Sequence, residues 1–346
     1  MTTQSDTAAA GVRMRRPPRW RAVWLLAVAV VLLLLLIASV RIGSRSVGWH
    51  DIVAALGGST DTLEEAAVAK RIPRTLLAAI SGAGLAVAGV VMQGVTRNPL
   101  ADPGILGVNI GASLAVLVGI VWLQLVSADQ FVWVAIIGAG CAAVFVYAVG
   151  SLGRGGATPM KVALAGAAVS AALASFTTAV LLPRADIAGT FQSWQIGGVG
   201  GATYDALRHV GPFVAVGFAV SMLSARGLNS LALGDEVAAG LGQRVALTRA
   251  LAALGGVVLC GAVTAVTGPI SFVGLVVPHA CRLVIGVDHR WLIPLSALVG
   301  AALLTGSDVI GRVVARPEEI DVGIVTALIG APFFIYLVRR QKVRDL

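Results

Sequence analysis

Residues 268–291 read GPISFVGLVVPHACRLVIGVDHRW, and this stretch joins an apolar segment directly to a polar one. Pro278 interrupts the apolar part, and polar side chains crowd the part that follows. These side chains are His279, Arg282, Asp288, His289 and Arg290. An apolar segment that ends in such a cluster predicts a membrane span whose end forms a docking or gating surface.

The composition of the whole chain indicates a membrane protein. Hydrophobic residues make up 57% of the 346 residues and charged residues only 12%, and the mean hydropathy is +0.90. A water-soluble domain of this size would expose large apolar patches. A spanning helix needs about 20 apolar residues, and such segments recur from end to end. We therefore expect an all-α integral membrane protein, a polytopic bundle of about ten transmembrane helices. Their predicted ranges are 22–40, 73–93, 104–123, 131–149, 161–182, 208–224, 246–267, 270–285, 292–310 and 322–338.

The distribution of charge predicts how this bundle is oriented. With a cytoplasmic N-terminus, 17 of the 26 Lys and Arg residues fall on the cytoplasmic side, as the positive-inside rule requires. Both termini are then cytoplasmic, with tails at 1–21 and 341–346 that flank one transmembrane domain at 22–340. The net charge of +9 therefore reflects topology and gives no reason to expect nucleic acid as a partner.

Two classes of membrane protein are disfavoured by what the sequence lacks. None of the three lysines follows a glycine, so the chain has no Gly-Lys-Ser/Thr phosphate loop and is not a P-loop ATPase by itself. Ionisable residues are scarce in the predicted spans, with Asp308 close to an end, whereas ion-coupled carriers hold charged groups at mid-membrane. A standalone ion-coupled secondary transporter is therefore disfavoured, and it is kept as the alternative from another class of protein.

The segment Asn98–Gly104 joins the second and third predicted spans on the cytoplasmic side. Its two prolines stop one helix and shape the entry to the next, with Asp102 placed like an N-cap. Two interpretations remain open here, a rigid connector and a part of an inner gate.

A second cytoplasmic loop, at about 225–244, predicts a short amphipathic helix outside the bilayer. Gly234 breaks the chain, and Asp235 then caps a helix on which apolar residues share one face at helical spacing. This face needs a surface to cover it, either the membrane and the protein's own loops or a groove on a cytosolic partner.

Several separate motifs, in order from about Arg71 to Arg340, resemble those of the FecCD-type permeases of ABC importers. The matching residues are Arg71-Ile-Pro-Arg74, Ser81-Gly82, Met92-Gln93, Arg97-Asn-Pro-Leu-Ala-Asp-Pro-Gly104, Leu106-Gly107, Gly111-Ala112, Leu233-Gly234, residues 268–290 and Gly323-Ile-Val-Thr-Ala-Leu-Ile-Gly-Ala-Pro-Phe-Phe334.

The resemblance implies a type II importer permease with ten spans per subunit, in a bacterial inner or plasma membrane. It implies three kinds of partner besides membrane lipid: a second permease subunit, identical or paralogous, a cytosolic ABC ATPase dimer, and an extracytoplasmic substrate-binding protein. The chain itself then binds no cofactor and is not an enzyme, because ATP and Mg are used by the ATPase. The family's coupling segment matches Leu233, Gly234, Asp235, Glu236, Val237, Ala238, Leu241 and Gly242.

The resemblance also assigns a docking role to three arginines on the outer side. Arg71 and Arg74 precede the second predicted span and Arg312 follows the ninth, and guanidinium groups suit carboxylates on a binding protein. The alternative is pairing within the chain, with Glu64, Glu65, Glu318 or Glu319.

Gate and pathway residues follow from the same resemblance. Leu100, in the Asn-Pro-Leu-Ala connector, matches the inner gate, and Thr158 is its approximate counterpart between the fourth and fifth spans. Gln192, Trp194 and Gln195 correspond to the outer mouth of the pathway, where an aromatic residue is alternatively a packing residue.

The polar cluster after Pro278 is not expected to bind metal, because the spacing of His279, Cys281, Asp288 and His289 fits no standard zinc pattern. As a cytoplasmic motif loop, His279, Arg282, Asp288 and Arg290 are expected to form a charged network or to contact the ATPase.

One departure from the family occurs in Glu319–Gly323, where Asp321 replaces a proline. The expected substrate is a ferric siderophore, with haem and cobalamin left open.

Overall fold

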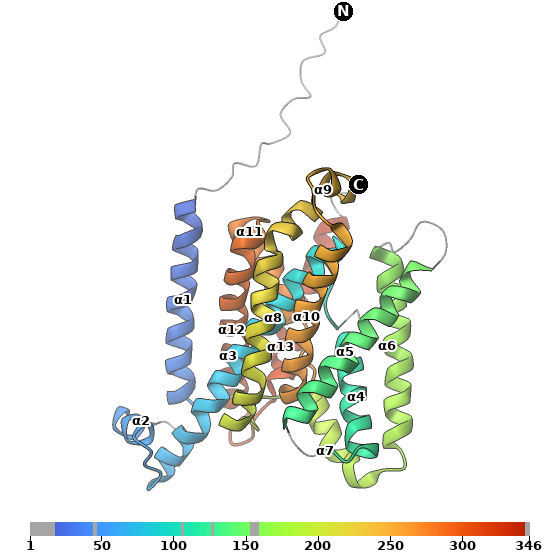
Figure 1. Ribbon diagram of the computed structural model, residues 1–346. Coiled ribbons are helices and arrows are strands. Elements are labelled where there is room, and N and C mark those ends of the chain that lie inside the picture. The colour runs from blue at the N-terminus through green and yellow to red at the C-terminus, as the bar shows by residue number, and fades with distance from the viewer. Residues whose placement is uncertain (1–17, 44–46, 105–106, 126–127, 153–158, 343–346) are drawn as a thin grey trace, which may run out of the picture.

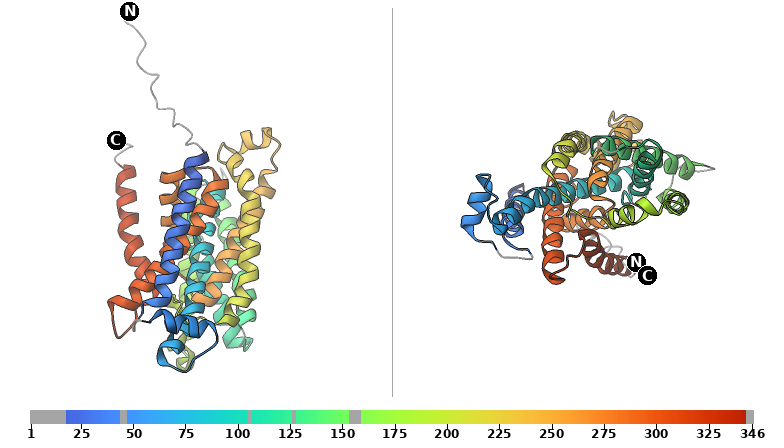
Figure 2. Two further views of the ribbon diagram at one scale, coloured as in Figure 1. Left: turned by 90° about the vertical axis from the view of Figure 1, so that its left-hand side faces the viewer. Right: turned by 90° about the horizontal axis from the view of Figure 1, so that it is seen from below.

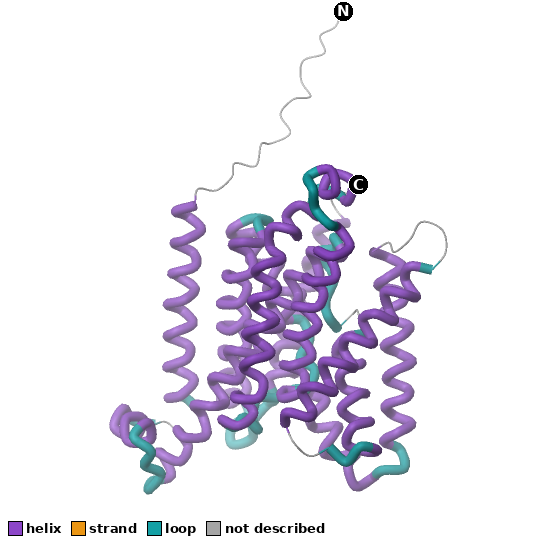
Figure 3. Tube along the Cα trace, in the orientation of Figure 1, coloured by secondary structure: helices purple, strands orange, loops and turns teal. Residues whose placement is uncertain are grey.

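The computed structural model describes residues 18–43, 47–104, 107–125, 128–152 and 159–342 (Figure 1). These residues form helices and connecting loops, and none of them lies in a strand (Figure 3). The all-α architecture predicted from the sequence is therefore confirmed. The helices are α1 (Pro18–Arg41), α2 (Trp49–Leu56), α3 (Leu63–Thr96), α4 (Val108–Trp122), α5 (Ala128–Ser151), α6 (Pro159–Leu181), α7 (Ala185–Ile196), α8 (Tyr204–Leu231), α9 (Asp235–Gly240), α10 (Val245–Thr267), α11 (Val273–Ile285), α12 (His289–Val314) and α13 (Val322–Lys342).

Ten of these helices coincide with the ten predicted spans. Within the described ranges, seven helices are long and apolar enough to cross a membrane. The other three predicted spans are shorter apolar helices, at Val108–Trp122, Val273–Ile285 and Val322–Tyr336. Fifteen helical residues reach only about 22 Å, less than a hydrocarbon core of about 30 Å. The count of ten complete crossings is therefore not confirmed.

The helix α3 forms the centre of the bundle. Most of its apolar segment is buried, and it packs against α8, α10, α11 and α12. Small residues make this possible, since a methyl group at Gly82 would overlap the carbonyl oxygen of Gly300 on α12, and one at Gly89 would overlap that of Gly274 on α11. Close approach of backbones at small residues is typical of helix packing in membranes.

The start of α3 differs from the prediction. The Oγ1 atom of Thr62 accepts from the N–H of Glu65 at 3.2 Å, and the Glu65 carboxylate accepts from the N–H of Thr62 at 3.3 Å. This capping box begins the helix ten residues before the predicted span, with Pro73 inside it. Arg71 and Arg74 therefore lie within a helix and not in a loop before it.

The two ends of the bundle carry different elements (Figure 1; Figure 2, left). α1 begins and α13 finishes at the end where α9 lies, while α2 and α7 lie at the opposite end. We call these the α9 end and the α7 end. α1 stands at one flank and α6 at the other, so α3, α10 and α12 lie between them.

Candidate functional site

The predicted coupling helix is present as α9, and it is shorter than the predicted loop. Residues 225–231 belong to α8, and the turn after them reaches Gly234, whose φ of 105° favours glycine. Gly234 is the N-cap, so Asp235 is the first helical residue and not the cap. Ala238 is buried against the bundle, whereas Val237 and Leu241 are 51% and 61% exposed.

The predicted apolar face of α9 is therefore split, because Ala238 points inward. One turn apart, Val237 and Leu241 remain as an uncovered apolar pair, and Leu233 just before the helix is 61% exposed as well. Glu236 and Gly242 are also exposed. An exposed apolar pair on a short helix suits a groove on another protein.

The carboxylate of Asp235 ties α9 to two other elements. Its Oδ1 atom accepts from Nη2 of Arg249 on α10 at 2.8 Å and lies 3.3 Å from Nη2 of Arg97. Arg97 is the C-cap of α3 and has a left-handed backbone, with φ 51° and ψ 31°. Arg97, which closes α3 just before the predicted gate connector, therefore contacts α9.

The connector itself is compact and runs back into the bundle (Figure 3). Within it, Oδ1 of Asn98 accepts from the N–H of Leu100 at 3.0 Å, and Leu100 is half-buried. Asp102 is 9% exposed and accepts from the N–H of Gly104 at 3.0 Å. It does not cap α4, because the N-cap is Gly107, so the predicted capping role of Asp102 is wrong.

The connector faces the start of α6 across a cavity of about 420 Å³. Arg97, Asn98 and Pro99 line one side of it, and residues of the first turns of α6 line the other. The second predicted gate residue, Thr158, lies outside the described residues. The gating role of Leu100 stays a prediction.

The segment 268–291 does not form a polar loop after Pro278. α11 runs through Pro278 to Ile285, so His279 and Arg282 lie on a helix and only 286–288 form a loop. Proline lacks the N–H that would bond the carbonyl oxygen of Gly274. Instead, Nε2 of Gln93 on α3 donates to this oxygen at 3.2 Å. His279 packs edge to face on Phe333 of α13, with ring centroids 5.9 Å apart.

Asp288, in the short loop before α12, joins three helices at the α9 end. Its carboxylate accepts from Nδ2 of Asn229 on α8 at 2.8 Å and from Nη2 of Arg290 at 3.0 Å, and lies 3.6 Å from Nη1 of Arg21 on α1. Burial alone would raise the pKa of Asp288, but the hydrogen bonds from Arg290 and Asn229 outweigh it and lower the pKa to about 2. The predicted charged network is therefore present for Asp288 and Arg290.

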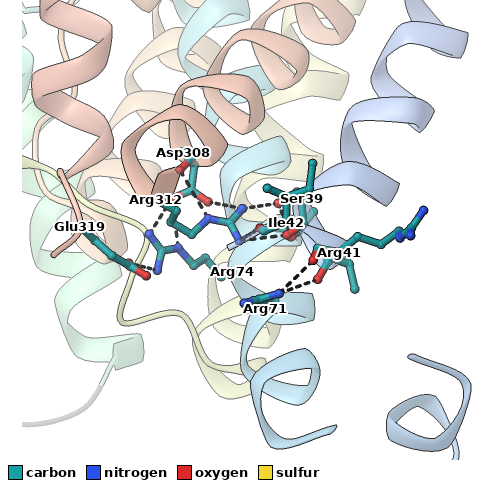
Figure 4. A network of polar contacts seen from close by, with 10 residues as sticks. Ser39, Arg41, Ile42, Arg71, Arg74, Asp308, Arg312 and Glu319 are labelled. Atoms are coloured by element: carbon teal, nitrogen blue, oxygen red, sulfur yellow. Dashed lines mark hydrogen bonds and ion pairs between the residues drawn. The ribbon is translucent and has the colours of Figure 1, made fainter. Parts of the chain in front are cut away.

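The α7 end carries a buried cluster of charges (Figure 4). Arg312, in the last turn of α12, is 1% exposed. Its guanidinium donates to the carbonyl oxygens of Ser39 and Ile42 at 2.9 and 3.1 Å and to Oγ of Ser39 at 2.6 Å. Its Nη2 atom also lies 3.0 Å from Oδ2 of Asp308, one turn earlier. Arg312 therefore fastens the end of α1 to α12.

The other two predicted docking arginines belong to the same cluster (Figure 4). Nε and Nη2 of Arg74 donate to Oδ1 of Asp308 at 3.0 and 2.9 Å, and Nη1 donates to Glu319 at 2.6 Å. Arg71 is 7% exposed and donates to the carbonyl oxygens of Val40 and Arg41, both at 3.2 Å. Pairing within the chain, the alternative left open above, is thus present for Arg74 and Glu319.

Burial limits how these arginines meet a partner. Direct contact by Arg71 or Arg312 with a binding protein requires the cluster to open first. Glu319 is 38% exposed at its side chain and Arg74 is 15% exposed, so this pair is the part of the cluster that reaches the surface. The docking role stays a prediction.

The predicted outer-mouth residues lie on α7, a helix that the sequence analysis missed. Trp194 packs on Phe191 with ring centroids 5.3 Å apart, which agrees with the packing alternative. Gln192 is exposed, and Gln195 lines a mostly apolar groove of about 660 Å³ between α7, the segment 269–272 and α13. In the same region Asp321, in place of the family's proline, packs against Gly198.

Sequence reasoning gave no role to several residues of these sites, among them Ser39, Asp308, Arg97 and Arg249. Asp308 carries a usable signal, because a carboxylate inside a predicted span needs a buried partner. Arg97 belongs to a matching motif that assigns it no contact with α9, and no local pattern marks Ser39 or Arg249. Among the described residues, no group of three or more His, Cys, Asp or Glu side chains is close enough to hold a metal ion.

Comparison with known proteins identifies a family that the chain matches. Residues 31–340 match the FecCD transport family. The chain is 39% identical to YfiZ of Bacillus subtilis, named a probable siderophore transport system permease protein, over 92% of this chain and 96% of YfiZ. It is 41% identical to FepD of Escherichia coli, the ferric enterobactin transport system permease protein, over 91% and 96%.

A solved structure agrees with the fold. A metal-chelate type ABC transporter in an inward-facing conformation matches with a TM-score of 0.78 and 26% identity, over 92% of this chain and 99% of the other. Permeases named for hemin and for cobalamin transport are also among the relatives of the chain.

Proposed function

The chain belongs to the FecCD transport family, and from this premise we propose that it forms the translocation pathway for a ferric siderophore. Its relatives are permease subunits of ABC transporters, so it is a multi-pass membrane permease and not an enzyme, and ATP is hydrolysed by a separate subunit. The alternative, a standalone ion-coupled secondary transporter, finds no support in these relatives.

The observation that supports the proposed substrate is the higher identity to two siderophore permeases. YfiZ and FepD are 39% and 41% identical to the chain over more than nine-tenths of it, whereas the hemin permease HmuU of Yersinia pestis is 36% identical over 90% of it. The scarcity of charge within the spans suits a bulky chelate that must pass through and not bind tightly.

The proposed orientation puts the α9 end in the cytoplasm and the α7 end outside. It is supported by the excess of Lys and Arg on the side of α9 and by the position of α9 at the same end of the bundle as the start of α1 (Figure 1). Val237 and Leu241 then meet the ABC ATPase, and the surface at Arg74 and Glu319 meets the extracytoplasmic binding protein. A second permease subunit completes the pathway.

Uptake of radiolabelled iron tests the substrate. Cells that lack the gene are given ⁵⁵Fe as ferric enterobactin, ferrichrome, ferric citrate or haemin, and cobalamin is given in a parallel culture. We expect the uptake of one ferric siderophore to be lost and to return with the wild-type gene. Loss of haemin or cobalamin uptake alone would favour those substrates, and uptake that persists without any ATPase subunit would exclude the proposal.

Charge on α9 tests the proposed ATPase contact. Val237→Glu places a carboxylate in the exposed apolar pair and should abolish both copurification of the ATPase and uptake. Ala239→Glu is the matched control, because Ala239 is also exposed but lies on the other side of the same short helix. Equal loss in both variants would contradict a contact centred on Val237 and Leu241.

A further inference from the structure

The gate connector is held at its two ends in different ways. Immediately before its first residue, Arg97 reaches Asp235 of α9 across the surface, and the two side chains are each 42% exposed. At its other end, Asp102 is 9% exposed and lies against the start of α11, where a Cβ added to Gly274 would meet its Oδ2 atom at 3.3 Å. One attachment is exposed and the other is buried.

These attachments lead to different parts of the molecule. The ion pair ties Arg97 to the short helix α9, whereas a buried carboxylate such as that of Asp102 moves only with the structure around it. Displacement of α9 therefore acts on the connector at Arg97, while the region of Asp102 stays with α11. Leu100, the predicted gate residue, lies between the two points.

The connector is built to turn as a unit. The bond from the N–H of Leu100 to Oδ1 of Asn98 closes its first turn at 3.0 Å, and the backbone of Arg97 already has the left-handed conformation that separates this turn from α3. The cavity of about 420 Å³ between Arg97, Asn98 and Pro99 and the first turns of α6 gives this turn space to move.

We propose that the ion pair between Arg97 and Asp235 is the strut that passes movement of α9 to the inner gate. Arg97 is then a positioning residue, which acts on Leu100 through the turn and not on substrate. The proposal rests on the proposed function, because it requires an ATPase that moves α9. The second ion pair of Asp235, with Arg249, joins α9 to α10 and not to the connector, so it orders α9 without acting on the connector directly.

Labelling of a cysteine at the gate tests this strut without a known substrate. Leu100→Cys is introduced with Cys141→Ser, since the other two cysteines, Cys260 and Cys281, are buried. The permease is purified with its ATPase subunits in nanodiscs. The rate of reaction with fluorescein maleimide is measured without nucleotide and with ATP and vanadate, alongside ATP hydrolysis.

We expect this background protein to change its labelling rate severalfold between the two states. Arg97→Gln should bring the ratio of rates close to one while the ATPase stays bound and active, and Arg97→Lys should restore part of the ratio. Asp235→Asn should have a similar effect, and the double variant should lose no more than either single variant.

Two further variants separate the strut from general effects. Arg226→Gln removes an exposed arginine of α8 at the same end, which forms no ion pair with any carboxylate in the described ranges, and should keep the full response. Arg249→Gln should keep the response as well. A full response in Arg97→Gln, an equal loss in Arg249→Gln, or release of the ATPase by Arg97→Gln would each overturn the strut. No nucleotide response in the background protein would overturn the proposed function together with it.

Discussion

The two ends of the molecule use the same pair of residue types, arginine and aspartate, in opposite settings. At the α7 end, Arg312 and Asp308 are each 1% exposed and are surrounded by further donors and acceptors. At the α9 end, Arg97 and Asp235 are each 42% exposed, and Asp235 pairs in addition with Arg249 on α10. A buried pair that loses one partner is costly, whereas an exposed pair is worth little. The difference indicates one end that holds helices together and another that lets them move.

The largest expected effect on stability comes from a substitution in the buried cluster at the α7 end. Arg312→Ala leaves Asp308 with Arg74 as its remaining partner and frees the end of α1, so we expect a loss of about 3 to 5 kcal/mol in the free energy of unfolding. Thermal unfolding in detergent measures this through the reaction of the buried thiols Cys260 and Cys281 with a maleimide dye. Arg316→Ala is the control, because Arg316 is exposed and its guanidinium makes one bond to Gly43. Equal destabilisation by both variants would contradict the comparison.

The next effect concerns the helices that join the two ends. Gly82→Ala puts a methyl group into the carbonyl oxygen of Gly300 and forces α3 and α12 apart, at a cost of about 1 to 3 kcal/mol. Gly240→Ala is the matched control, because a Cβ there meets nothing. The same unfolding assay reads both variants, and a neutral Gly82→Ala would show that the contact between α3 and α12 is loose.

A smaller effect is expected at Asp288, which is intermediate between the two settings, with 19% of its side chain exposed. Asp288→Asn should cost about 1 kcal/mol at pH 7. Because the pKa of Asp288 is lowered to about 2 from an ordinary value of 3.8, its ionised form stabilises the protein above pH 4. This contribution disappears as the pH falls from 4 to 2, so the wild type and the variant should converge in stability over that range. A difference that stays constant down to pH 2 would contradict the pairing.

The smallest effect on stability is expected for the exposed ion pair at the α9 end. Arg97→Gln removes only an exposed pair and should change the free energy of unfolding by about 0.5 kcal/mol or less, although it is expected to disable gating. Thermal unfolding of this variant beside Arg312→Ala gives the contrast directly. A destabilisation of Arg97→Gln as large as that of Arg312→Ala would mean that both ends hold the fold.

The sequence predicted the elements better than their limits. The apolar segments are long, so their helices were identified, and Gly234 located α9. The start of α3 was missed because Pro73 is typical of a first helical turn, and the capping box at Thr62 and Glu65 outweighs that signal. α7 was missed because it has only 12 residues, too few for a span, and its Phe191 is buried against Leu117 of α4 and Leu181 of α6.

The burial and the partners of the charged side chains could not be predicted from the sequence. Arg71, Arg74 and Arg312 lie near the ends of apolar segments, where charge is ordinarily exposed. Here the end of α1 covers Arg71 and Arg312, with Ser39 accepting from Arg312 at a separation of 273 residues, and Arg74 pairs with Asp308 and Glu319. Likewise, no local pattern relates Arg97 to Asp235. Burial and pairing of this kind depend on how distant segments pack.

The hydrogen bond from Gln93 to Gly274 has a consequence for how related sequences diverge. The amide of Gln93 supplies the donor that Pro278 lacks, so each residue is suited to the other although they belong to different helices. Replacement of Gln93 alone strands a carbonyl oxygen in the core, and replacement of Pro278 alone supplies a second donor where one already binds. We therefore expect the two positions to change together, with a residue at 278 that has its own N–H accompanying an apolar residue at 93. Paired substitution of this kind is a record of packing that can be read without coordinates.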